Sequence, residues 1–316
     1  MRVLFVLLLA FAASCQSSGL APATGPFVLV LGTAQDGGLP QIACDCSHCR
    51  AARSDSSRAR FVTSILLVDP RTNSCWLFDA TPDLPRQIQL ARNLGVSRAA
   101  SPGRPALFEG IFLTHAHMGH YTGLLHLGRE AYGSEPTPVH LSPRFAEFLR
   151  GNGPWDQLVS EQRIILQEFE FGTEIALAPD LSVTALAVPH RDEYSDTCAF
   201  RIEGPSASLL YLPDIDKWEL WEHSIEAELA RSTVALVDGT FYSGDELSGR
   251  DMSSIPHPSV CESMQRFEDL PAQLRERVFF THLNHSNPLV DPASPAAVRV
   301  WALGFKLARQ GARFGL

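Results

Sequence analysis

The sequence predicts an α/β fold. Runs of β-prone apolar residues alternate with helix-like segments along nearly the whole chain, which is the pattern of strands and helices packed in layers. There is no internal repeat with a period of about 20–50 residues, so a solenoid or propeller is not expected. With 316 residues, 45% of them hydrophobic, the chain is long enough to form one large domain or two fused halves.

The first half of the chain is expected to begin with a buried strand and to continue through a hairpin. Apolar runs bounded by Gly, Pro and Asn predict strands at 27–33, 61–68, 75–78 and 110–113, of which the second and third pair across a turn. Proline in the first turn and glycine after the last turn mark the ends of helices. On these signals we expect helices at 84–94, 121–132 and 143–151.

The second half is expected to be richer in strands. Apolar runs predict strands at 181–188, 197–202, 207–212, 234–238 and 278–281. Between two of them, segment 216–231 alternates acidic residues with tryptophan and aliphatic residues, which predicts an amphipathic helix. A last helix is expected at 298–310.

The segment 114–120, Thr-His-Ala-His-Met-Gly-His, directly follows the strand predicted at 110–113. Its H-x-H-x-x-H spacing places three imidazoles in a small volume at the end of that strand. Neutral imidazole is the commonest metal ligand in proteins. The alternative is a solvated His-rich loop or histidines bound within the core. Three more residues of metal-binding type favour the metal site, because each follows an apolar, β-prone run: His190, Asp214 and His282.

This spacing resembles the H-x-H-x-D-H signature of the metallo-β-lactamase superfamily, and the resemblance continues in order along the chain. It implies a four-layer αβ/βα sandwich with the ligands on loops along one edge of the two sheets. It implies that Asp214 bridges two metal ions. One ion is then held by His115, His117 and His190, and the other by His120 and His282.

The resemblance also assigns catalytic roles. Asp79 matches the acidic strand end that precedes the histidine motif, and it is expected to orient a ligand histidine. Together with Asp214 and His120 it forms the predicted catalytic group. We expect zinc at this centre, with manganese or iron as alternatives.

Gly119 departs from the superfamily signature, which has Asp at this position. Without that carboxylate the second metal is expected to be weak, exchangeable or absent. Asp36 and Asp83 are the candidates to replace it.

Three cysteines form a C-x-C-x-x-C cluster at Cys44, Cys46 and Cys49. Three thiolates this close suit a tetrahedral zinc with a fourth ligand. The cluster resembles a structural zinc knuckle in two superfamily members, the pyrroloquinoline-quinone biosynthesis protein B family and the cyclic phosphodiesterase of phosphonate breakdown. The resemblance favours His285 as the fourth ligand over His48. The alternative is a disulfide plus a free thiol in an oxidising compartment.

Two further residues are predicted to contact the substrate. Arg191 can clamp an anion or pair with the neighbouring Asp192 or Glu193. His257 stands between two prolines and is expected on a loop near the cleft.

The first 20 residues are expected to be a signal peptide and lipoprotein tether, followed by a single domain over 21–316. Arg2 precedes an apolar run that ends in small residues, and Cys15 is the expected lipidation site. The alternative is an ordinary signal peptide cut before Cys15. The first interpretation places the protein in the bacterial cell envelope, anchored to a membrane. The net charge of −9 and the absence of a basic stripe argue against a nucleic-acid partner.

The sequence therefore predicts an exported metallo-hydrolase that uses metal-bound hydroxide on a small, anionic ester or phosphodiester. One alternative is a metal-dependent oxygenase-type enzyme related to quinone cofactor biosynthesis. The other is a binding lipoprotein that kept the fold without catalysis.

Overall fold

A computed structural model describes residues 24–96, 103–247 and 255–316, and its framework is two seven-stranded sheets. The first sheet has the order β14-β1-β2-β3-β4-β5-β6 and the second the order β13-β12-β11-β10-β9-β8-β7. The strands of the first sheet are β1 (Phe27–Gly32), β2 (Ser64–Asp69), β3 (Ser74–Phe78), β4 (Gly110–Phe112), β5 (Thr137–Leu141), β6 (Ile164–Glu168) and β14 (Arg313–Gly315). Those of the second are β7 (Glu174–Ala178), β8 (Leu181–Val188), β9 (Thr197–Glu203), β10 (Ser208–Leu212), β11 (Val234–Asp238), β12 (Val278–Thr281) and β13 (Lys306–Leu307).

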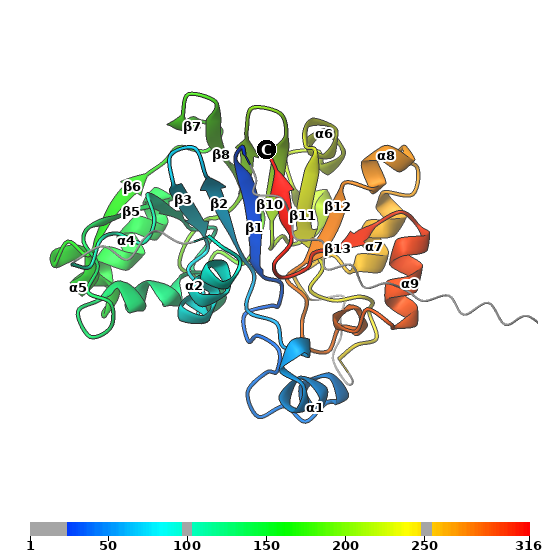
Figure 1. The fold of residues 1–316 in the computed structure, drawn as a ribbon. Coiled ribbons are helices and arrows are strands. Elements are labelled where there is room, and N and C mark those ends of the chain that lie inside the picture. The colour runs from blue at the N-terminus through cyan, green and yellow to red at the C-terminus, as the bar shows by residue number, and fades with distance from the viewer. Residues whose placement is uncertain (1–23, 97–102, 248–254) are drawn as a thin grey trace, which may run out of the picture.

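Helices cover the outer faces of the two sheets, so the molecule has four layers (Figure 1). The inner faces pack on each other through a central core that includes Val30, Phe78, Phe200 and Tyr211. Each outer face has its own apolar core beneath its helices. The helices are α1 (Ser47–Ser54), α2 (Leu84–Asn93), α3 (Met118–Tyr121), α4 (Pro143–Gly151), α5 (Trp155–Ser160), α6 (Ile225–Arg231), α7 (Val260–Arg266), α8 (Ala272–Arg275) and α9 (Pro295–Ala302). The predicted αβ/βα sandwich is confirmed.

Three predicted helices are wrong in extent. Segment 121–132 is not one helix: α3 begins earlier, inside the histidine motif, and a 3₁₀ helix, η2 (Thr122–Leu127), follows it. At Gly123 the chain passes so close to the Thr81 carbonyl oxygen that a Cβ would lie 2.1 Å from it. A regular helix with side chains on all faces does not fit there.

Segment 216–231 divides into a 3₁₀ turn, η3 (Trp218–Leu220), and the shorter α6. Trp218 and Trp221 are buried and donate hydrogen bonds to Ser263 and to the Ala187 carbonyl. The packing of the two tryptophans therefore determines the conformation of this segment. The last helix, α9, lies earlier than predicted and gives way to Gly304, with a φ of +89°, before β13.

The direction of the strands places the candidate metal ligands at one edge of the sandwich. In the second sheet β10, β11 and β12 run parallel, and in the first sheet β3 and β4 run parallel. The carboxyl ends of parallel strands meet at the same edge of a sheet. The residues that follow these strands include Asp79, the histidine motif, Asp214 and His282.

The loop after β1, with α1, projects from the two sheets (Figure 1). Single-residue bridges tie it down, from Ala34 to Val62, from Ala34 to Leu283, and from Leu39 to Arg60. The predicted tether 1–20 and its Cys15 lie outside the described residues. Within the described part of the chain, no helix is both long and apolar enough to span a bilayer.

Candidate metal centres

The carboxylate of Asp214 is the centre of a buried group of histidines. Its Oδ2 lies 3.1 Å from the Nε2 of His120 and 3.2 Å from the Nε2 of His282. Its Oδ1 lies 3.7 Å from the Nε2 of His190. His190, Asp214 and His282 come from loops after three different strands, and His120 comes from α3, so only the folded chain brings them together.

The ligand atoms divide into two neighbouring sets. His115, His117 and His190 form one set whose ligand atoms all lie within 4.8 Å of one another. His120, His282 and Asp36 form the second set by the same measure. The structure thus brings together the residues that the sequence predicted as ligands of two metal ions. Asp214 also lies within 4.8 Å of His115 and His120, and of His190 and His257, by the same measure, so the two sets adjoin through it.

Several of these buried atoms have no hydrogen-bond partner. They are the Nε2 atoms of His120, His190 and His282, together with Asp214 Oδ2 and Asp36 Oδ1. Burying a polar atom without compensation costs free energy, and such atoms call for a specific cause. Imidazole nitrogens and carboxylate oxygens are the donors that zinc, manganese and iron accept. The residues present therefore fit a metal centre.

The other ring nitrogen of each of three histidines is held by the surrounding protein. Asp79 Oδ2 lies 2.8 Å from His120 Nδ1, Asp216 Oδ1 lies 2.9 Å from His190 Nδ1, and Thr240 Oγ1 lies 2.8 Å from His282 Nδ1. Such partners fix the tautomer and direct the free nitrogen towards a metal. Asp79 therefore lies where it can orient a ligand histidine, as the sequence predicted. The sequence did not indicate Asp216 and Thr240 as partners of histidines.

Asp79 is itself firmly placed. It is fully buried and accepts hydrogen bonds from the Thr114 hydroxyl and backbone N–H and from the Tyr211 hydroxyl. Asp79 and His282 both have left-handed backbone conformations, with φ of 64° and 58°. Strained conformations of non-glycine residues persist where the surrounding structure fixes them, often at functional sites.

Burial and neighbouring charges shift the pKa values of the residues around Asp214. Burial holds the pKa of His115 well below its ordinary value, and the neighbouring His120 lowers it further. Burial opposes charge on His120 too, but Asp79 and Asp214 outweigh it and raise the pKa of His120 well above the ordinary value. Burial would raise the pKa of Asp214, but His282 and His120 hold it well below its usual range. The centre thus holds an ionised carboxylate among imidazoles.

The two predicted substrate-contacting residues lie at the rim of this group. His257 Nδ1 lies 2.7 Å from Asp238 Oδ2 and 3.9 Å from Asp214 Oδ1. Arg191 is half-exposed and lies 3.5 Å from Glu193, which in turn contacts His117 Nε2 at 3.0 Å. Of the pairings considered for Arg191, the structure contains the one with Glu193.

Asp83 lies outside both sets of ligands. Its Oδ2 accepts a hydrogen bond from the backbone N–H of Val62, and its Oδ1 pairs with Arg86. It therefore does not replace the missing carboxylate.

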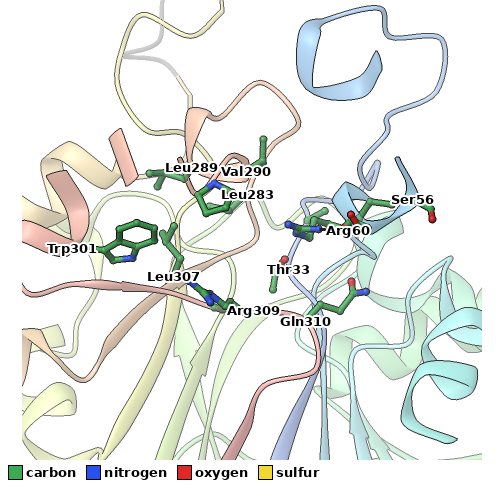
Figure 2. A pocket seen from close by; sticks show the side chains of 15 residues that line it. Thr33, Ser56, Arg60, Leu283, Leu289, Val290, Trp301, Leu307, Arg309 and Gln310 are labelled. Carbon is green, nitrogen blue, oxygen red and sulfur yellow. Dashed lines mark hydrogen bonds between the residues drawn. The ribbon is translucent and has the colours of Figure 1, made fainter. Parts of the chain in front are cut away.

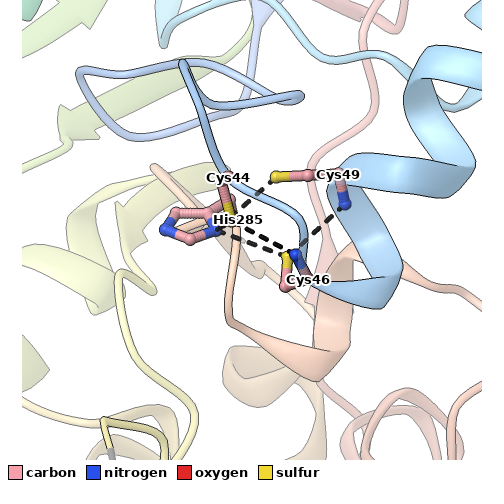
Figure 3. A group of neighbouring side chains, drawn as sticks. All are labelled: Cys44, Cys46, Cys49 and His285. Carbon is pink, nitrogen blue, oxygen red and sulfur yellow. Dashed lines mark hydrogen bonds between the residues drawn. The ribbon is translucent and has the colours of Figure 1, made fainter.

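A second, sulfur-rich group lies in the projecting loop (Figure 3). The Sγ atoms of Cys44, Cys46 and Cys49 lie 3.4, 3.6 and 3.6 Å from the Nδ1 of His285. In a tetrahedral zinc site with ordinary bond lengths, sulfur and nitrogen ligands are about 3.6 Å apart. The three thiols are not joined in disulfides. His48 instead contacts the His285 carbonyl oxygen through its Nδ1.

A separate pocket of about 430 Å³ lies near the base of the same loop (Figure 2). Its lining includes Arg60, Trp301 and Arg309. It also includes Thr33 and Leu283, which neighbour the ligand-bearing segments. None of the predicted site residues lines it.

Comparisons with known proteins agree with this geometry. The family model described as Beta-lactamase superfamily domain matches residues 76–283. Coenzyme PQQ synthesis protein B from Pseudomonas protegens is 30% identical over 295 residues, covering 85% of this chain and 92% of the relative. The protein of the same name from Methylobacterium sp. is 27% identical, covering 90% of this chain and 97% of the relative.

Solved structures extend the comparison. Zn²⁺-bound PqqB from Methylobacterium extorquens superposes with a TM-score of 0.77 at 25% identity, covering 92% of this chain and all of that one. A diphosphatase from the PhnP family has the same fold, with a TM-score of 0.62 at 19% identity and coverage of 92% and 97%. The chain therefore belongs to the metallo-β-lactamase superfamily and, within it, to the family of coenzyme PQQ synthesis protein B.

Proposed function

We propose that this protein is a metal-dependent hydrolase of a small, anionic ester or phosphodiester. The observation that carries the proposal is the convergence of buried imidazole nitrogens and a carboxylate oxygen that have no hydrogen-bond partner. A fold neighbour described as a diphosphatase supports the choice of a phosphate-containing substrate.

In this proposal His115, His117 and His190 would hold one metal ion, His120 and His282 would hold another, and Asp214 would serve as a ligand as well. A bound zinc with an open position lowers the pKa of its water to about 7 and polarises the substrate oxygen. Asp79 keeps His120 in the orientation and tautomer that leave Nε2 directed towards Asp214.

Two rim residues handle the substrate. Asp238 holds the Nδ1 of His257, which leaves Nε2 as the ring atom to contact the scissile group. Arg191 is exposed enough to exchange its contact with Glu193 for an anionic substrate group. The buried histidines and Asp214 exclude bulk water from the far side of the centre.

An oxygenase-type reaction in quinone cofactor synthesis is the second candidate. The curated relatives, all named coenzyme PQQ synthesis protein B, favour it. The same nitrogen and oxygen ligands suit redox-active iron as well as zinc. The metal that copurifies with the protein separates the candidates, since zinc or manganese supports hydrolysis and iron supports oxidation.

The deciding experiment measures metal content and hydrolysis of bis(p-nitrophenyl) phosphate for the full chain and for a His115→Ala, His117→Ala double variant. We expect the variant to lose at least one metal ion, to keep one zinc, and to lose hydrolysis. The same metal content in both proteins would contradict the assignment. A chain without metal at the histidines would support the third interpretation, a binding lipoprotein.

We also propose that the chain is exported and anchored in the bacterial envelope through Cys15. The apolar segment after Arg2 supports this. Replacing Cys15 by Ala is expected to move the protein from the membrane fraction to the soluble fraction. An unchanged distribution would exclude lipidation at this residue.

A further inference from the structure

Position 119 has no room for a side chain. A Cβ built on Gly119 would lie 2.1 Å from Asp36 Oδ1 and 2.8 Å from Asp36 Cα. Real Cβ atoms do not approach other atoms this closely. The backbone of Gly119 does not have a positive φ. Glycine is therefore required here for space, and the atoms that take the space belong to a carboxylate.

Asp36 is held in this place from two directions. The backbone N–H of the preceding Gln35 donates to the Leu283 carbonyl at 3.0 Å, which ties the segment to the residue after His282. The side-chain amide of Gln35 donates to Asp36 Oδ2 at 2.9 Å. The other oxygen, Oδ1, is left facing the metal group.

That second oxygen has the surroundings of a ligand. Asp36 Oδ1 is buried without a hydrogen-bond partner of suitable geometry, and it lies 3.4 Å from His120 Nε2. The ligand atoms of Asp36, His120 and His282 all lie within 4.8 Å of one another. Asp214 Oδ2 lies 3.1 and 3.2 Å from the two histidines. Two carboxylates and two imidazoles thus face one point.

We propose that Asp36 is the carboxylate ligand of the second metal ion and takes over the role that the superfamily signature gives to the position of Gly119. The inference rests on the proposed metal-dependent function. It replaces the expectation of a weak or absent second metal, because the carboxylate has moved from the histidine motif to the loop after β1. The site then suits a divalent first-row ion such as zinc or manganese.

A reciprocal substitution tests the inference on the full chain. Metal per chain is measured for wild type, for Asp36→Asn, for Gly119→Asp, and for the double variant Asp36→Gly, Gly119→Asp. Asp83→Asn is the matched control, since Asp83 is a nearby carboxylate bound to Val62 and Arg86 outside the centre. Circular dichroism and thermal melting report whether each variant is folded.

We expect wild type and Asp83→Asn to hold about three metal ions, two of them at the histidines, and Asp36→Asn to hold one fewer. Gly119→Asp alone is expected to lower the melting temperature, because the new side chain meets Asp36. The double variant is expected to recover both the melting temperature and the second metal.

Two results overturn the inference, and they differ in their meaning for the proposed function. If folded Asp36→Asn keeps both metals at the histidines, Asp36 is not a ligand, and the proposed function stands. If wild type holds metal only at the cysteines, both the inference and the proposed function fail.

Discussion

The two candidate metal centres are built in opposite ways. The centre of Cys44, Cys46, Cys49 and His285 takes three ligands from six consecutive residues of a projecting loop. The histidine–aspartate centre takes its ligands from the ends of strands in both sheets, and its members are largely buried. The spacing of the sequence therefore almost defines the cysteine centre. The histidine–aspartate centre forms only when the two sheets pack together.

The centres nevertheless share two chain segments. The loop after β1 carries Asp36 and then the cysteines, and the segment after β12 carries His282 and then His285. Between them, Leu283 N–H donates to the Thr33 carbonyl at 2.8 Å. Loss of the cysteine centre should therefore disturb the second histidine set, with Asp36 and His282, more than the set of His115, His117 and His190.

The largest effect is expected from Cys49→Ser. Cys49 is fully buried against Ala34, Leu39 and Ala52, so its loss removes both a zinc ligand and packing at the base of the loop. We expect loss of one zinc, a destabilisation above about 4 kcal/mol, and faster proteolysis within residues 37–60. Metal analysis, thermal unfolding and limited proteolysis measure these changes.

Cys261→Ser is the matched control, because Cys261 is half-buried in α7 outside either centre. We expect it to keep all metal ions. If Cys49→Ser loses its zinc while metal at Asp36 and His282 is unaffected, the centres are independent despite their shared segments.

A difference in pH dependence is expected next. Burial raises the pKa of the Cys49 thiol to about 12, so zinc must displace a proton from it throughout the neutral range. Each pH unit below that pKa lowers zinc affinity tenfold for this proton alone. Burial holds the pKa of His115 well below its ordinary value of 6.5, so this imidazole stays neutral over the same range.

From pH 8 to pH 6 the affinity of the cysteine centre should therefore fall by at least about 100-fold more than that of the set containing His115. Zinc release to a coloured chelator measures this, with the His115→Ala, His117→Ala variant identifying which signal belongs to which centre. Release of both metals over one pH interval would show that the centres do not differ in this way.

The sequence predicted those parts of the site that depend on spacing or on an ordered set of strand ends. The cysteine cluster and the histidine motif are local, and His190, Asp214 and His282 each follow an apolar run. Asp216 and Thr240 have no such signal, and Asp238 ends an apolar run without any sign of which histidine it will contact. Thr240 meets His282 because β11 and β12 run parallel with a definite register. Asp216 follows β10 and meets His190, which follows β8, and Asp238 meets His257, which lies in the loop before α7. These pairings exist only in the folded chain.

The fold shows the same division. The hairpin of β2 and β3 and the helices α2 and α4 match their predictions because turn and capping residues mark their ends. Segments 121–132 and 216–231 differ from their predictions. Their conformations depend on residues distant in the sequence, which pack against Gly123 and the two buried tryptophans. The sequence named both Asp36 and Asp83 as possible replacements for the missing carboxylate, and only the structure separates them. Asp36 packs against Gly119 at the centre, whereas Asp83 accepts a hydrogen bond from Val62 outside it.

The smallest effect is expected at Asp79, which contacts no ligand atom that faces the metal position. Asp79→Asn keeps the shape but removes the charge that orients His120 Nδ1 at 2.8 Å. Loss of such a partner costs about 10-fold in metal affinity. The loss should fall first on the second histidine set, since Asp79 contacts His120 directly. Asp79 reaches His115 only through Thr114, whose hydroxyl lies 3.0 Å from His115 Nδ1. Competition with a chelator of known affinity measures this loss. Asp69→Asn is the control, because Asp69 is also buried but pairs with Arg71 away from the centre.

Equal weakening of metal binding at all positions would contradict the prediction. It would mean that Asp79 supports the fold as a whole, through Thr114 and Tyr211, and that the two histidine sets do not act separately.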